Sequence, residues 1–181
     1  MIQKNVHPEY VRVLGIAPSS RGFGFALMEG ENTLVDWGVK AVKGGDKNAR
    51  SLSNAANLIA HYEPNVIIIE DGERSRHGSR VRALTKEIVA LAKEEKIKVK
   101  RFSRKQVNLG ILQDGQGTKH ALAEHLAARF PEELGFRLPG KRRLWTSEKY
   151  QMDIFDAVAL GMAYFSLNES HRPGLNCSNS T

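Results

Sequence analysis

Cysteine is almost absent from this sequence, and long apolar runs are absent altogether. The one cysteine, Cys177, lies in the polar stretch NCSNST, so an intramolecular disulfide and a zinc site built from cysteines are both excluded. No apolar run approaches the roughly 18 residues that span a bilayer, and the N-terminal MIQKNVHPEY lacks the apolar segment of a signal peptide. We therefore expect a cytoplasmic protein with no membrane partner.

Acidic residues are scarcer than basic ones. The 20 Asp and Glu against 27 Lys and Arg give a formal net charge of +7. This surplus favours a polyanionic partner such as nucleic acid, although a basic solvated surface needs no partner. At 181 residues, of which 41% are hydrophobic, the chain suits one soluble domain and excludes neither an enzyme nor a binding module. We expect flexible ends at 1–10 and 168–181 around one folded domain at 11–167.

The pattern along the chain predicts an α/β fold. Short turns between the first three strands indicate an antiparallel meander, and the uninterrupted run VIIIE is typical of a strand in a parallel sheet covered on both faces. Together they predict a mixed five-stranded sheet, three antiparallel strands and then parallel ones, flanked by helices: the ribonuclease H-like architecture. The expected strands are 11–17, 22–29, 33–42, 66–70 and 97–102, and the expected helices are 52–62, 81–91, 103–109, 118–129 and 147–165.

Three acidic residues are expected to meet at one edge of this sheet. Glu70 ends VIIIE at the carboxyl end of a buried strand, where open α/β sheets place functional groups. Asp153 and Asp156 share one face of the last helix, which is apolar nearly all round. Buried carboxylates need compensation, and Mg²⁺ accepts carboxylate and water oxygens. The set indicates metal-assisted phosphodiester hydrolysis, in which one ion activates water and another stabilises the leaving oxygen.

Each acid also has a purely structural interpretation. An acid in the first turn of a helix gains a few tenths to about 1 kcal/mol from the helix dipole. We expect Asp153 and Asp156 to lie beyond the first turn, where this explanation fits poorly. Glu70, taken alone, is equally consistent with a solvated strand end.

Four stretches of the sequence, taken in order, carry a family resemblance. They are VLGIAPSSRGFGFAL, VIIIE, RKQVNLGILQDGQGTKHALAEHL and DIFDAVALGMAYF, and they span about residues 11 to 165. Together they resemble the RuvC family of Holliday-junction resolvases and its plasmid- and phage-borne relatives. The resemblance implies an endonuclease that cuts branched DNA such as four-way junctions, acts as a homodimer in DNA recombination and repair, and requires Mg²⁺ or Mn²⁺.

The same resemblance implies roles for individual residues. Glu70 matches the second catalytic acid of the family and Asp153 and Asp156 match its final pair, so these three would hold the metal. Lys119 resembles a family lysine near the scissile phosphate. The segment 134–145, LGFRLPGKRRLW, has no counterpart in a minimal resolvase, and its role stays open.

The sequence departs from the family at its first strand. The family strand ends in a catalytic Asp followed by Pro, whereas this sequence has Ala17-Pro18. The missing carboxylate usually bridges both metals, so we expect the chain as written to be impaired or inactive. Two explanations stay open: a natural site that Asp71 or Glu148 completes, or an Asp replaced by Ala to trap an inactive enzyme.

Basic residues follow Glu70 closely and are expected to hold phosphates beside the acids. Arg142 and Arg143 adjoin Trp145, a combination that suits backbone binding with base stacking or a surface loop anchored by Trp. DGQGTKHA suits a phosphate at a helix start or a plain linker with Thr118 as cap. The nucleic-acid-binding candidates are Arg21, Arg74, Arg76, Arg80, Arg82, Lys119, Arg142 and Arg143.

Three functions compete on this sequence. The first is a structure-selective endonuclease, and the second is a non-catalytic nucleic-acid-binding protein that kept the fold and lost the first acid. The third is an actin-like or sugar-kinase ATPase, whose opening hairpin also resembles GIAPSSRGFGFAL. That fold needs two such domains, so it ranks last. Retention of Glu70, Asp153 and Asp156 favours the first, because buried acids are costly without a metal.

Overall fold

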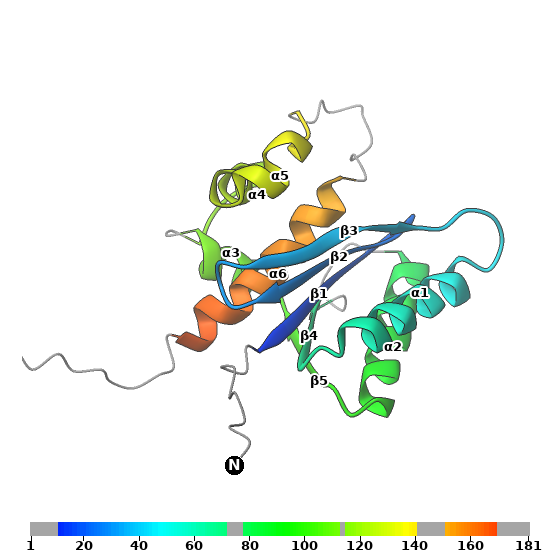
Figure 1. The fold of residues 1–181 in the computed structure, drawn as a ribbon. Coiled ribbons are helices and arrows are strands. Elements are labelled where there is room, and N and C mark those ends of the chain that lie inside the picture. The colour runs from blue at the N-terminus through cyan, green and yellow to red at the C-terminus, as the bar shows by residue number, and fades with distance from the viewer. Residues whose placement is uncertain (1–10, 72–77, 113–114, 141–150, 170–181) are drawn as a thin grey trace, which may run out of the picture.

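The molecule is built around one twisted sheet with helices on both faces (Figure 1). The structure, a computed structural model, describes residues 11–71, 78–112, 115–140 and 151–169. Arg74, Arg76, Arg142, Arg143, Trp145 and Glu148 lie outside these residues.

The sheet has five strands in the order β3-β2-β1-β4-β5. β1 pairs antiparallel with β2, which pairs antiparallel with β3, whereas β4 runs parallel to β1 and β5 runs parallel to β4. The predicted mixed sheet is therefore confirmed. The strands are β1 (Arg12–Ser19), β2 (Gly22–Glu29), β3 (Leu34–Ala41), β4 (Val66–Glu70) and β5 (Lys98–Phe102).

Two groups of helices cover the two faces of the sheet. One group packs against the face that Leu14 and Ile16 of β1 present, and the other packs against the face that Val13 and Ala17 present, because neighbouring strand residues point to opposite sides. α1 (Lys47–Tyr62) and α2 (Ser79–Glu94) form the first group. The second contains α3 (Arg104–Ile111), α4 (Lys119–Arg129), the short α5 (Pro131–Leu134), the 3₁₀ turn η1 (Gly135–Arg137) and α6 (Met152–Glu169).

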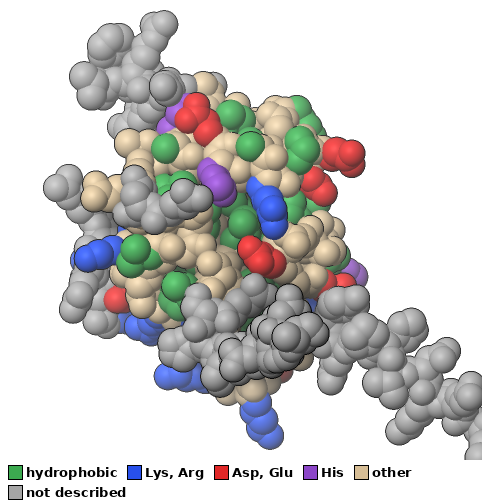
Figure 2. All heavy atoms as spheres, turned by 90° about the vertical axis from the view of Figure 1, so that its left-hand side faces the viewer, with side chains coloured by type: hydrophobic (Ala, Val, Ile, Leu, Met, Phe, Trp, Pro, Cys, Tyr) green, Lys and Arg blue, Asp and Glu red, His purple; other side chains and the backbone are tan. Residues whose placement is uncertain are grey.

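The α3 to α6 side of the molecule carries mixed charges. Figure 2 views it directly and shows acidic, basic and histidine side chains interspersed with apolar ones among the described residues. The basic surplus is therefore not gathered on the visible part of this face.

α6 lies directly on β1 and β2 because glycines let the backbones approach. A Cβ added at Gly15 would lie 2.2 Å from the carbonyl oxygen of Ala157, and one added at Gly24 would lie 2.0 Å from that of Asp153. Real Cβ contacts are never this short, so only glycine fits at either strand position. These two contacts fix the position of α6 along β1 and β2. They thereby also fix where the acidic residues of α6 lie relative to the strand ends.

α6 differs from its prediction at both ends. It begins at Met152, so Asp153 lies in its first turn, and the expectation that both acids lie beyond the first turn is wrong for Asp153. The helix also continues past Phe165 to Glu169, because Leu167 packs on the core and Asn168 accepts a hydrogen bond from Lys100 Nζ at 2.8 Å.

The short α5 was not expected from the sequence. It begins with Pro131 at its first position, where the missing N–H and the fixed φ of proline suit a helix start. The other predicted elements differ from the structure by a few residues at their ends. No helix among the described residues is long and apolar enough to cross a membrane.

Candidate functional site

Position 17 lies at the carboxyl end of β1, under the first turn of α6. Ala17 pairs with Gly24 of β2, and Gly24 is the residue on which the backbone of Asp153 rests. The Ala17 side chain is buried, with 6% of its surface exposed, in the apolar cluster that α6 covers. A longer side chain at this position would therefore start beside Asp153, on the α6 face of the sheet.

Glu70 stands next to this position on β4. Ile16 of β1 pairs with Ile69 of β4, so Ala17 and Glu70 are the next residues on the two parallel strands. Ile68 belongs to the α6-side cluster, and strand alternation places Glu70 on that same face. The expected position of Glu70 at the carboxyl edge of the sheet is therefore confirmed.

Asp156 completes the arrangement from α6, one helical turn after Asp153. Its side chain is 9% exposed, and both of its oxygens have cationic partners. Oδ1 accepts from Arg104 Nη1 at 2.8 Å, and Oδ2 accepts from Lys119 Nζ at 2.8 Å. Burial by itself raises the pKa of Asp156, but Arg104 and Lys119 outweigh it and hold the pKa below its ordinary value. Asp156 is therefore ionised at neutral pH.

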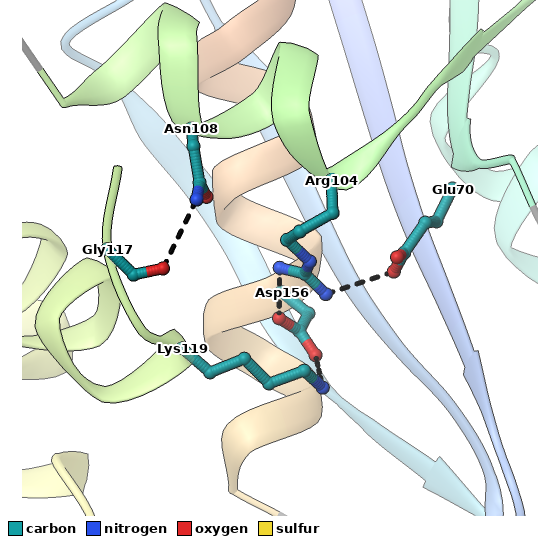
Figure 3. A network of polar contacts seen from close by, with 6 residues as sticks. All are labelled: Glu70, Arg104, Asn108, Gly117, Lys119 and Asp156. Carbon is teal, nitrogen blue, oxygen red and sulfur yellow. Dashed lines mark hydrogen bonds and ion pairs between the residues drawn. The ribbon is translucent and has the colours of Figure 1, made fainter. Parts of the chain in front are cut away.

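Arg104 joins this carboxylate to Glu70. Its Nη2 lies 3.0 Å from Glu70 Oε2, so the guanidinium stands between the two acids (Figure 3). One planar cation thus holds a carboxylate from β4 and a carboxylate from α6 with charge-assisted hydrogen bonds. We call Glu70, Arg104, Lys119 and Asp156 the edge cluster.

Both cations of the edge cluster are the first residues of helices. Arg104 follows Ser103, whose side chain accepts from the Gln106 N–H while the Gln106 side chain accepts from the Ser103 N–H, a complete capping box. Lys119 follows Thr118, which caps α4 by accepting from the Ala121 N–H. The caps therefore set where each cation leaves the backbone.

A buried amide keeps the two helix starts together. Asn108 of α3 is 7% exposed, and its Nδ2 donates to the carbonyl oxygen of Gly117, two residues before Lys119, at 3.3 Å (Figure 3). The interpretation of DGQGTKHA as a linker with Thr118 as helix cap therefore has structural support in the Thr118 hydrogen bond.

The acids of the edge cluster fit a hard cation as a pair. Glu70 and Asp156 already share one positively charged group, and Mg²⁺ is commonly held by one or two carboxylates with water filling the other positions. Within the described parts of the chain, no three or more His, Cys, Asp or Glu side chains stand close enough together to hold a metal ion. Asp153, placed one turn away against Gly24, stays a predicted ligand.

The basic residues predicted to bind nucleic acid separate into two kinds. Arg80 is engaged in the fold, since its guanidinium donates to Asn48 Oδ1 at 2.8 Å and to the carbonyl oxygen of Ser19 at 2.9 Å. It thereby ties α2 to α1 and to the end of β1. Arg21, in the turn after β1, and Arg82, in the first turn of α2, are exposed.

Arg104 is the member of the edge cluster that the sequence pattern does not single out. It lies inside the motif RKQVNLG, but neither its charge nor its spacing links it to Glu70 or Asp156, which are 34 and 52 residues away. The available signal was local: Ser103 followed three residues later by Gln106 predicts a capped helix start directly after β5. That start places Arg104 at the same sheet edge as Glu70.

Comparison with known proteins rests on structure alone. No protein-family model matches this sequence, and no curated protein sequence matches it. Among solved structures, Thermus thermophilus RuvC in complex with a Holliday junction substrate is similar at 16% identity and a TM-score of 0.68, over 90% of this chain and 97% of that one. Thermus thermophilus RuvC in another structure gives 14% identity and a TM-score of 0.66, over 88% and 96% of the two chains. The Holliday junction resolvase of fowlpox virus is similar at 15% identity and a TM-score of 0.53, over 86% of this chain and 99% of that one.

These matches define the fold in two steps. The chain has a ribonuclease H-like α/β fold, as its mixed sheet and two helical layers indicate. Within that class its fold is that of RuvC and of the poxvirus resolvase, which it shares over nearly their whole length. At 14–16% identity the likeness establishes the fold alone.

Proposed function

We propose that this protein is a structure-selective endonuclease of the Holliday-junction resolvase type, whose present site is impaired because Ala17 stands where a carboxylate is needed. The observation that carries the proposal is the meeting of Glu70 and Asp156 on one cation beside position 17. It occurs at the carboxyl edge of a sheet whose solved structural neighbours include resolvases.

The acidic and basic residues of the site would have different roles. Glu70 and Asp156, with Asp153, would hold Mg²⁺ or Mn²⁺, and a bound divalent ion would activate water and stabilise the leaving oxygen. Lys119 is 38% exposed on its side chain, so it can hold a phosphate oxygen while its ammonium stays beside Asp156. Arg21 and Arg82, both exposed, would hold backbone phosphates away from the cut.

Two copies of the chain would act together on a junction. A four-way junction needs two cuts in two strands, and a homodimer related by a two-fold axis presents two identical sites. We propose this assembly from the family resemblance and from the symmetry of the substrate.

A second function is favoured by Ala17 itself. Its methyl group cannot bind a cation, and it is buried in an apolar cluster. A protein of this kind would bind branched DNA without cutting it.

One assay separates the two functions. Four-way, forked and linear DNA are incubated with Mg²⁺ or Mn²⁺ and with the unaltered chain, its Ala17→Asp variant, or Ala17→Asp combined with Glu70→Gln. We expect junction binding by all three proteins, and cutting by Ala17→Asp at least about a hundredfold faster than by the other two, in the range of losses seen when a catalytic group is removed.

Either of two results would contradict this assignment. If Ala17→Asp cuts nothing and binds junctions no more tightly than linear DNA, the resolvase proposal fails. If the unaltered chain already cuts, and its own Glu70→Gln variant, added to the same assay, cuts at the same rate, the assignment of the acids is wrong. Tight junction binding without cutting by Ala17→Asp would favour the non-catalytic function.

A further inference from the structure

Arg104 occupies the place that a cation shared by Glu70 and Asp156 would need. Its two terminal nitrogens lie 3.0 Å from Glu70 Oε2 and 2.8 Å from Asp156 Oδ1. The second oxygen of Asp156 is engaged by Lys119 at 2.8 Å, so both oxygens of this carboxylate already carry a cationic partner (Figure 3). A divalent ion between the same two acids would also stand directly beside the guanidinium charge, which repels it.

We propose that Arg104 is a built-in competitor for the divalent cation of this site, so that the ion binds Glu70 and Asp156 only after the guanidinium has moved away. This inference rests on the proposed function, in which these two acids hold the metal. It assigns a role to a residue that neither the sequence motifs nor the acidic set had singled out.

The backbone of Arg104 is held independently of its side chain. Its backbone is fixed at the start of α3 by the Ser103 and Gln106 capping box, whereas its side chain is 29% exposed. The side chains of the two acids are less exposed than that of Arg104, at 15% for Glu70 and 9% for Asp156. The side chain of Arg104 can therefore turn outward on a fixed backbone while the two carboxylates keep their positions.

DNA provides a second acceptor for the displaced guanidinium. A phosphate offers two oxygens in the geometry that a guanidinium binds bidentately, as a carboxylate does. A phosphate that draws Arg104 outward would uncover Glu70 and Asp156 for the ion, so DNA and metal should each strengthen the binding of the other. The metal-binding acids would then be exposed mainly when the substrate is present.

The test is a titration with Mn²⁺ followed by calorimetry and by electron paramagnetic resonance, neither of which needs activity. The proteins are the full unaltered chain, Arg104→Gln, Arg104→Lys, and Lys105→Gln as a control that removes the same charge from the next, exposed residue. We expect Arg104→Gln to bind Mn²⁺ about tenfold more tightly than both the unaltered chain and Lys105→Gln. Arg104→Lys should lie between them, because an ammonium is a point charge that does not bridge two carboxylates as a fork.

A second titration adds an uncut four-way junction to each protein. The junction should tighten Mn²⁺ binding by the unaltered chain and by Lys105→Gln, and should change it much less in Arg104→Gln. Circular dichroism reports whether Arg104→Gln is folded, and Arg104→Lys provides the comparison if it is not.

The inference is overturned if Arg104→Gln binds Mn²⁺ no more tightly than Lys105→Gln, or if none of the proteins binds Mn²⁺. That result stands apart from the cutting assay, where Ala17→Asp can still resolve junctions and uphold the proposed function. Conversely, a gain of Mn²⁺ affinity in Arg104→Gln together with no cutting by Ala17→Asp would support the competitor role and refute the endonuclease.

Discussion

At the scale of single residues, Asp156 illustrates how a carboxylate stays ionised inside an apolar layer. Its neighbours in α6, Phe155 and Ala157, are almost completely buried, and desolvation alone would favour the neutral acid. Arg104 and Lys119 reverse that preference and lower the pKa. The charged form of Asp156 therefore depends on two helix starts that lie far from it in the sequence.

The first prediction concerns this ionisation. Asp156→Asn should lower the free energy of unfolding at pH 7 by about 2 kcal/mol, less than the loss typical of a fully buried pair because Arg104 and Lys119 are partly exposed. Asp156 has a pKa below its ordinary value of 3.8, so its stabilising effect is present above that pH and is lost as the pH falls further.

Urea unfolding at pH 7 and at pH 3 measures this effect. The stability gap between the unaltered chain and Asp156→Asn should be largest at pH 7 and should narrow at pH 3. A gap that is the same at both pH values would show that the ionised carboxylate does not stabilise the fold.

The residues of the site were predictable to different degrees. Glu70 is recognisable in the sequence as a single acid that ends an otherwise apolar strand. Asp156 is recognisable as an acid in a helix that is otherwise apolar nearly all round. Arg104 gives no comparable signal, since basic residues are common on the surface of any soluble protein. Only the tertiary fold brings α3 to the end of β4 and makes this arginine part of the site.

At the scale of elements, the packing of α6 on β1 depends on Gly15. A methyl group there would meet the carbonyl oxygen of Ala157 at 2.2 Å. That neighbour is backbone within a helix, which cannot turn aside as a flexible side chain can. Any side chain at this position must push α6 away from the sheet and carry Asp156 with it.

Gly15→Ala should therefore lower the free energy of unfolding by about 3 kcal/mol, the upper range for overpacking a core. The matched control is Gly45→Ala, because a Cβ at Gly45 meets nothing within 4 Å. Gly45→Ala should change stability by no more than about 0.5 kcal/mol. Equal midpoints for the two variants in thermal or urea unfolding would mean that α6 does not pack on β1 this closely.

The elements themselves were largely predictable because local signals agree with the fold. The isoleucines of β4 predict a buried strand. Ser103 and Thr118 predict helix starts, and in the structure they cap α3 and α4, which begin at the next residue. The boundaries of α6 were not predictable. Its apolar residues lie on every side of the helix, so hydrophobic periodicity does not indicate where the helix begins or ends. Its C-terminal end is extended by tertiary contacts of Leu167 and Asn168.

At the scale of the whole molecule, the formal charge of +7 favours binding to DNA, and such binding should weaken as salt is added. If Arg21 and Arg82 hold phosphates, each releases counterions from DNA on binding. The logarithm of the junction-binding constant should then fall linearly with the logarithm of the salt concentration, with a slope of about −0.9 for each phosphate contacted.

The double variant Arg21→Gln, Arg82→Gln should reduce the magnitude of this slope by about two. Lys93→Gln combined with Lys96→Gln removes the same charge from exposed residues in the last turn of α2 and just after it, and should leave the slope nearly unchanged. Fluorescence anisotropy with a labelled junction between about 50 and 200 mM salt provides the measurement. Identical slopes for the two double variants would place the DNA elsewhere on the surface.

The position of α6 in the chain has a consequence for synthesis. This helix follows every strand of the sheet in sequence, yet it covers the face on which Ala17 and Glu70 lie and contributes Asp156. A growing chain on the ribosome therefore lacks the helix that lies directly on β1 and β2 until α6 emerges, and an incompletely covered apolar face is prone to wrong association. It also lacks Asp156, so a chain that stops before α6 cannot bring this carboxylate beside Glu70 on Arg104.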